Sequence, residues 1–206
     1  MLKRTKGRLL LTLLVVTGFA GTINNTTLTK KERNFVVGHL KETKNDLLKS
    51  IKGLSETQLN FKRSPEQWSI KECFYHLARA ENGLWDMLDA TMKEPTAPEN
   101  CPELEISDED LLNGITIGEA TKDEQAFLPG NAQWPSLNGA VSAFKTSRSK
   151  SLKYTKTTTE DLRNHFIQLP MGWVDGYQFI VIISAYSKRY THQINEIKAD
   201  PDFPKN

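Results

Sequence analysis

Apolar residues recur at helical spacing in four long stretches of the chain. The first stretch, about residues 30 to 52, starts after a capping box formed by Thr29 and Glu32 and ends before Gly53. The apolar positions of this stretch are Phe35, Leu40, Leu47, Leu48 and Ile51. The spacing predicts a first long helix that buries this side.

The second stretch has the clearest helical pattern in the sequence. Ser69 and Glu72 form another capping box, and the helix is expected to continue to about Met92. One broad apolar face is formed by Ile70, Cys73, Phe74, Leu77, Leu84, Trp85 and Leu88. We therefore expect a second long helix in a buried position.

Two further helices are predicted in the second half of the chain. Ser136 caps the third, whose apolar positions are Val141, Phe144, Leu152 and Tyr154. Its basic residues Lys145, Arg148 and Lys150 indicate one solvated face. The fourth runs from about 174 to 198, and its apolar run 179–183 predicts deep burial on all sides before a stop at Pro201.

The connections between these stretches are long and polar. Residues 54–67 and 155–173 are predicted as irregular, and residues 93–106 contain three prolines before a short helix at about 107–113. Residues 114–135 lack a clear period and are expected to wrap the surface. With no convincing β-alternation, the pattern indicates an all-α fold, a four-helix bundle with long connecting loops, in a single domain.

The N-terminus has the layout of a secretory signal peptide. Four basic residues precede the apolar run 9–16, and the small residues Gly18 and Ala20 suit a signal peptidase. We expect cleavage after Ala20, a short tail at 21–28 and a folded domain at 29–206, exported to the periplasm or the extracellular space. The alternative is an uncleaved N-terminal anchor. The apolar run is too short for a stable membrane span, which needs roughly 20 residues.

Charge and cysteine content argue against nucleic-acid binding, cysteine redox chemistry and a cysteine-rich metal site. The whole chain has 27 basic and 25 acidic residues, and removal of residues 1–20 changes the formal net charge from +2 to −2. Without a basic excess or a basic stripe, nucleic-acid binding is not expected. Cys73 and Cys101 fit neither a redox motif nor a cysteine-rich metal motif; a disulfide between them is an alternative to a buried, unreactive Cys73.

Two sequence blocks resemble the DinB-like family of four-helix-bundle metalloenzymes. They are WSIKECFYHLARAE at 68–81 and SAYSKRYTHQINEIKADPDFPKN at 184–206, in the family's order and about a hundred residues apart. The resemblance implies three histidine ligands, one in W-S-x-x-E-x-x-x-H and two in H-x-x-x-H ahead of x-x-Q-I. The first falls on His76, and the other two fall on Tyr186 and Tyr190.

The two tyrosines keep the ligand spacing of the family and change its chemistry. Residues four apart share a helix face, so two imidazoles there can meet a third from a facing helix. A phenol, with an ordinary pKa of about 10, must first lose a proton, whereas imidazole is available neutral at pH 7. We therefore expect no cofactor; the alternative is a divalent transition metal, Zn or Ni. Glu72 and Gln193 are expected to line the pocket.

Other candidate residues have ordinary structural interpretations. His192 lies about 160° around the helix from Tyr190, so it is not expected to replace a ligand. His76 can be a hydrogen-bonded interior residue, and Glu72 is explained by the capping box with Ser69. His39 and His165 are interpreted as ordinary helix-surface and loop residues. Trp85, Trp134 and Trp173 are expected in the core or lining a pocket.

Two functions remain open from the sequence, and no catalytic residue is assigned. The first is an exported, non-catalytic binding protein with a degenerate metal site and a small-molecule ligand in the bundle cavity. The second is a metal-dependent hydrolase or transferase with altered ligands centred on His76, such as a tyrosinate, Glu72 and water. The resemblance also allows a homodimer. No nucleic-acid partner and no stable membrane span after cleavage are expected.

Overall fold

A computed structural model describes residues 27–96, 104, 106–117 and 134–205. Its four long helices are α1 (Lys30–Ser50), α3 (Ile70–Thr91), α5 (Leu137–Thr157) and α6 (Gly176–Lys198). The predicted all-α bundle and its four helices are confirmed, and the bounds expected for the first, second and fourth are correct within two residues. The expected signal peptide and Cys101 lie outside the described residues.

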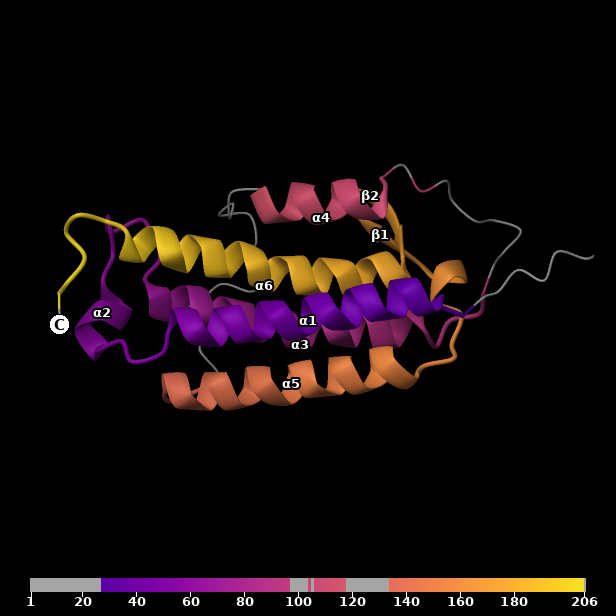
Figure 1. The fold of residues 1–206 in the computed structure, drawn as a ribbon, viewed down its shortest axis with the longest axis horizontal. Helices are drawn as coiled ribbons and strands as arrows, with labels where there is room; N and C mark the ends of the chain where they lie inside the picture. Colours follow the sequence, from indigo (N-terminus) through magenta and orange to yellow (C-terminus); the bar gives the residue numbers. More distant parts are fainter. Residues whose placement is uncertain (1–26, 97–103, 105, 118–133, 206) are drawn as a thin grey trace, which may run out of the picture.

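The four long helices form a closed ring in which each contacts two neighbours. Helix α1 packs on α5 and α6, and α3 packs on the same two helices from the opposite corner. Tyr75 and Trp134 are paired near one end of the bundle, and Trp85 and Tyr154 near the other. Thus α3 and α5 run in the same direction although they follow each other in sequence. The connection between them must therefore return along the full length of the bundle (Figure 1).

Part of this return is α4 (Asp108–Ile117), which is longer than the short helix expected at 107–113. Helix α4 packs on α6, on the side away from α5 (Figure 1). Its Leu111 and Ile115 are buried against the same apolar cluster as the first half of α6. Because α1, α3 and α4 all cover α6, the run 179–183 is buried on every side, as its sequence predicts.

Two of the predicted irregular connections contain regular structure. Ser55 and Gln58 form a capping box that starts α2 (Glu56–Asn60). The stretch 155–173 leads through a 3-10 helix (Leu162–Asn164) into a hairpin of β1 (Phe166–Leu169) and β2 (Gly172–Asp175). The prediction that 155–173 is irregular is therefore wrong for these two strands. Gly172, with φ of 122°, allows the tight turn that joins these short strands.

Burial corrects two of the predicted core positions. Phe35 is 45% exposed and stacks on His39, whose ring centroid is 6.0 Å away. Trp173 is 39% exposed on the hairpin, so it is not a core residue. Cys73 is buried with a free thiol, as expected, and burial raises its pKa to about 12. Within the described part of the chain, no helix is long and apolar enough for a membrane crossing.

Two apolar clusters fill the bundle, one toward each end. The cluster at the hairpin end includes Val36, Leu88 and Ile180, and the other includes Leu47 and Phe74. Between them lies a layer of polar side chains, all buried except the half-buried His39, which we call the polar layer. Its members come from all four long helices: His39 and Thr43 from α1, Glu81 from α3, Arg148 from α5, and Ser184 and Ser187 from α6.

Candidate functional site: an aromatic cluster beside a polar layer

The three positions that the family resemblance singles out lie together on α3 and α6. His76 and Tyr190 are fully buried, and their ring centroids are 5.1 Å apart. Tyr186 is half-buried one turn earlier on α6, with its ring centroid 6.2 Å from that of Tyr190. The capping box at the start of α3 sets the position of His76 along the helix, and the antiparallel packing of α6 brings the tyrosines to it.

Trp68 completes this aromatic cluster, which we define as Trp68, His76, Tyr186 and Tyr190. The Trp68 ring lies 4.7 Å from His76 and 6.3 Å from Tyr190, centroid to centroid. Since Trp68 immediately precedes the N-cap residue Ser69, the helix start holds its ring over the first two turns of α3. These three rings pack on one another at distances typical of favourable aromatic pairs.

The residues of the aromatic cluster do not fit the metal site that the family resemblance implies. That site needs three donors that bind at neutral pH, and here one imidazole is accompanied by two phenols. Across the residues that the structure describes, no group of three or more His, Cys, Asp or Glu side chains could hold a metal ion. We therefore derive no reaction step through a metal.

Glu72, one of the two predicted pocket residues, is engaged at the start of α3. Its carboxylate accepts hydrogen bonds from the Ser69 backbone N–H and from Lys62 Nζ, both at 2.8 Å. Partial burial alone would raise its pKa, but the bonds to Lys62 and Ser69 outweigh burial and lower it. The capping interpretation of Glu72 is thus confirmed.

Gln193 lies one turn beyond Tyr190 on α6 and is half-buried. Its Oε1 is enclosed and accepts no hydrogen bond from the residues that the structure describes. His192, by contrast, is 71% exposed, and its Nδ1 lies 3.4 Å from Glu196 Oε1. The prediction that His192 faces away from the two tyrosines is therefore confirmed.

Arg148 is the centre of the polar layer and is fully buried, so its predicted place on a solvated face is wrong. Nε and Nη2 donate to the two carboxylate oxygens of Glu81, each at 2.6 Å. Nη2 also donates to Ser187 Oγ at 2.6 Å, and Nη1 donates to Leu40 O and Thr43 Oγ1, each at 3.0 Å. One guanidinium thus bonds to the three other long helices.

The sequence contains a signal for the buried pair of Arg148 and Glu81. Arg148 lies four residues after Phe144 and four before Leu152, and Glu81 lies four after Leu77 and four before Trp85. Residues four apart share a helix face. Each charge therefore stands in line with the apolar face of its helix, and two opposite charges at such positions can pair in the core. Only the register between α3 and α5 decides that they meet.

His39 joins the polar layer from α1, so its interpretation as an ordinary surface residue is wrong. Its Nδ1 lies 2.6 Å from Ser184 Oγ, and that hydroxyl lies 3.2 Å from Thr43 Oγ1. Burial lowers the pKa of His39 below its usual value, and the positive charges of Lys188 and Arg148 lower it further. His39 is therefore neutral over a wider pH range than an exposed histidine.

A second charged cluster closes the hairpin end of the bundle. Arg163 donates to Asp175 at 2.6 Å, to Asp108 at 3.2 Å and to Glu32, and its guanidinium lies over the Tyr177 ring. These carboxylates start α6, α4 and α1. Nearby, His165, expected as an ordinary loop residue, hydrogen-bonds to two backbone carbonyls. This cluster fixes three helix starts.

Comparisons with known proteins bear on the family and the fold. Residues 39–188 match the sequence pattern of the DinB superfamily. A solved structure, YfiT from Bacillus subtilis, superposes with a TM-score of 0.60 at 13% identity, covering 84% of this chain and 89% of that one. It is described as "a probable metal-dependent hydrolase with an unusual four-helix bundle topology". The search of curated proteins gave no match.

Proposed function

The chain belongs to the DinB superfamily, and on that premise we propose that it is an exported, non-catalytic binding member whose metal-ligand positions have become an aromatic cluster. The observation that carries the proposal is the packing of His76 against Tyr190, with ring centroids 5.1 Å apart and neither residue exposed. The phenol ring of Tyr190 occupies the space beside His76, the one histidine of the family pattern that this chain retains.

The chemistry of these side chains supports binding over metal catalysis. A catalytic metal site keeps three protein ligands and one open position for water or substrate. Tyr190 is packed against Trp68 and His76, and Tyr186 lies beside the guanidinium of Arg189, 5.8 Å from ring centroid to Cζ. Aromatic and polar groups in this arrangement suit a small ligand with apolar and hydrogen-bonding parts at the half-exposed Tyr186 side.

A metal-dependent hydrolase or transferase with altered ligands is the second candidate, favoured by the retained His76 and by the description of YfiT. It would need a tyrosinate and a carboxylate such as Glu72. Against it stands the engagement of Glu72 by Ser69 and Lys62 at the start of α3.

Metal content of the untagged protein separates the two candidates. The full chain is expressed, the processed protein is purified without a histidine tag, and its metals are measured by mass spectrometry. We expect little bound metal in the natural protein and about one metal per chain in the Tyr186→His, Tyr190→His double variant. The matched control adds His76→Ala to the double variant and should lose the metal again.

Stoichiometric metal in the natural protein would overturn the non-catalytic proposal and favour the second candidate. A double variant that stays folded and empty would show that the assigned ligand positions are wrong. Sequencing the N-terminus of the exported protein tests the localisation independently. The pattern at Gly18 and Ala20 predicts a mature start at Gly21.

A further inference from the structure

Helix α5 carries a solvent-facing surface without any acidic residue. Its exposed positions are Asn138, Ser142, Lys145, Thr146, Ser149, Lys150, Lys153, Lys156 and Thr157. The four lysines fall within an arc of about 140° and extend about 17 Å along the helix. We call these lysines, with the Ser and Thr side chains between them, the α5 lysine stripe.

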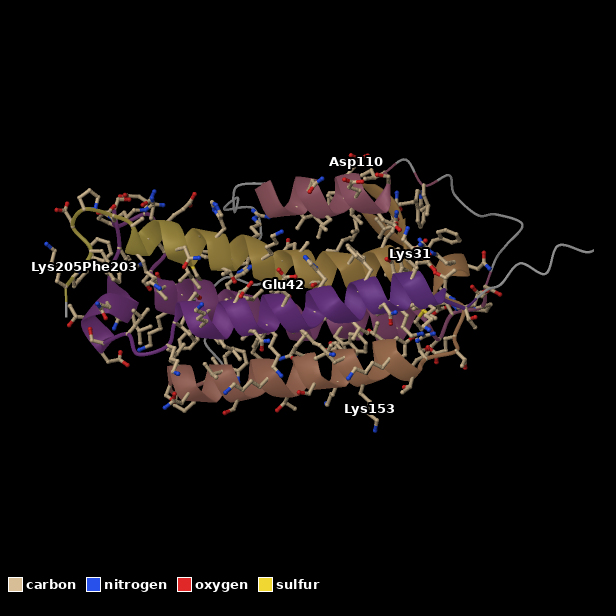
Figure 2. All side chains as sticks on the ribbon, in the orientation of Figure 1. Lys31, Glu42, Asp110, Lys153, Phe203 and Lys205 are labelled. Carbon is tan, nitrogen blue, oxygen red and sulfur yellow. The ribbon has the colours of Figure 1, made fainter. Side chains whose placement is uncertain are left out.

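The stripe lies on the outer side of the bundle. Helix α5 contacts α1 and α3 and is covered by no other described helix, and Lys153 points away from the bundle (Figures 1 and 2). The space between the side chains forms a shallow surface depression of about 460 Å³, lined by Lys145, Thr146, Ser149, Lys150 and Lys153. Lysine side chains, with Thr146 and Ser149 between them, therefore line one continuous surface.

The lysines of the stripe lack salt-bridge partners among the described residues, although Glu160 hydrogen-bonds to Tyr154 near the end of α5. None of the four forms an ion pair with a carboxylate in the described part of the chain, where other lysines such as Lys62, Lys71 and Lys93 do. On the neighbouring helix, Lys44 lies four residues after Leu40, whose carbonyl accepts from Arg148, so it adds positive charge on the α5 side of α1.

On the opposite side of the molecule, an acidic segment begins α4, and one of its carboxylates, Asp108, is paired with Arg163. Helix α4, which packs on α6 away from α5, begins with Asp108, Glu109 and Asp110 (Figure 1). The protein is therefore electrically asymmetric although its predicted mature net charge is close to zero. Such an asymmetry orients a protein in the field of a charged surface.

We propose that the α5 lysine stripe docks the protein peripherally on an anionic lipid bilayer, with α4 facing away from it. Lysine is a flexible, strongly hydrated point charge, which suits mobile headgroups with no fixed geometry. The stripe has no exposed arginine for bidentate phosphate contacts and no exposed aromatic ring for base stacking, so a nucleic acid fits it less well. It also lacks the apolar centre of a stable protein interface.

The proposal is tested by co-sedimentation of the exported, processed protein with vesicles of phosphatidylglycerol and phosphatidylcholine. The stripe variant is Lys150→Glu, Lys153→Glu; the matched control, Lys52→Glu, Lys205→Glu, makes the same charge change at exposed positions outside α5. Each lysine near an anionic surface strengthens binding about fivefold, so the stripe variant should bind at least about 25-fold more weakly. The control should bind like the natural protein.

Salt should weaken binding, and pure phosphatidylcholine vesicles should not bind. Equal losses in both variants would overturn the proposal, because binding would then follow net charge alone. Absence of binding by the natural protein, equally strong binding to duplex DNA, or a stripe-dependent dimer in sedimentation velocity would each overturn it as well. The metal measurement above is independent, so either proposal can fail without the other.

Discussion

Arg148 and Glu81 form a bidentate ion pair in the centre of the bundle, with both side chains at most 1% exposed. The pair belongs to α5 and α3, and its guanidinium also bonds to α1 and α6. It separates the two apolar clusters that fill the ends of the bundle. Buried charges of this kind are costly to desolvate, so their effect on stability depends on both partners being present.

Removing one member of the pair should destabilise the fold strongly. Arg148→Met or Glu81→Leu leaves the other group buried without its charge partner, and we expect a loss of about 3–5 kcal/mol in the free energy of unfolding. Urea denaturation of each variant measures it. The double variant Arg148→Met, Glu81→Leu should be more stable than either single variant. A double variant as unstable as the sum of the singles would contradict this account.

Stability should fall as the solution becomes mildly acidic, because of His39. Burial, Lys188 and Arg148 lower its folded-state pKa below the usual 6.5, while Glu42 opposes them. Below pH 6.5 the unfolded chain therefore binds more protons than the folded one, and the free energy of unfolding decreases as pH drops toward the lowered pKa. The slope from this one group is at most about 1.4 kcal/mol per pH unit.

Variants at His39 isolate this contribution. His39→Asn should remove its part of the pH slope between pH 7 and 5, measured by urea denaturation across that range. Lys188→Ala should reduce it, since one nearby positive charge is gone. Lys153→Ala, on the outer side of α5, is the matched control and should keep the natural slope. An unchanged slope in His39→Asn would show that other groups cause the pH dependence.

Tyr190 should contribute more to stability than Tyr186, which occupies the neighbouring metal-ligand position of the family pattern. Tyr190 is fully buried against Trp68 and His76, so Tyr190→Ala creates a cavity and should cost about 3–5 kcal/mol. Tyr186 is half-buried, and Tyr186→Ala should cost clearly less. Thermal and urea unfolding of the two variants compare them. Equal losses would mean that Tyr190 does not fill the interior in this way.

Replacement of glycine by alanine should have opposite effects on stability at Gly176 and at Gly38. A Cβ at Gly176 would lie 2.9 Å from the Leu162 carbonyl oxygen, a backbone atom that cannot move away easily, so Gly176→Ala should destabilise by about 1–3 kcal/mol. A Cβ at Gly38, inside α1, would meet nothing within 4 Å. Gly38→Ala should therefore stabilise by about 0.5–1 kcal/mol. Chemical denaturation of both variants gives the sign directly.

The long helices could be predicted from sequence because their signals are local. The capping boxes at Thr29 and Ser69 and the spacing of apolar residues after them involve neighbours within a few residues. The short hairpin at 166–175 was missed for the opposite reason. Its strands have four residues each, too few for a clear alternation, and their pairing depends on packing against the bundle.

The sequence by itself determined the helical periodicity, the helix starts, the all-α class and the residues at the assigned metal positions. Only the tertiary structure decided what those residues touch. Arg148 was expected on a solvated face because a lone positive charge is normally exposed. It is buried because α5 places it opposite Glu81 of α3. The two residues are 67 positions apart in the chain. Partners so far apart are set by helix packing, which no local pattern encodes.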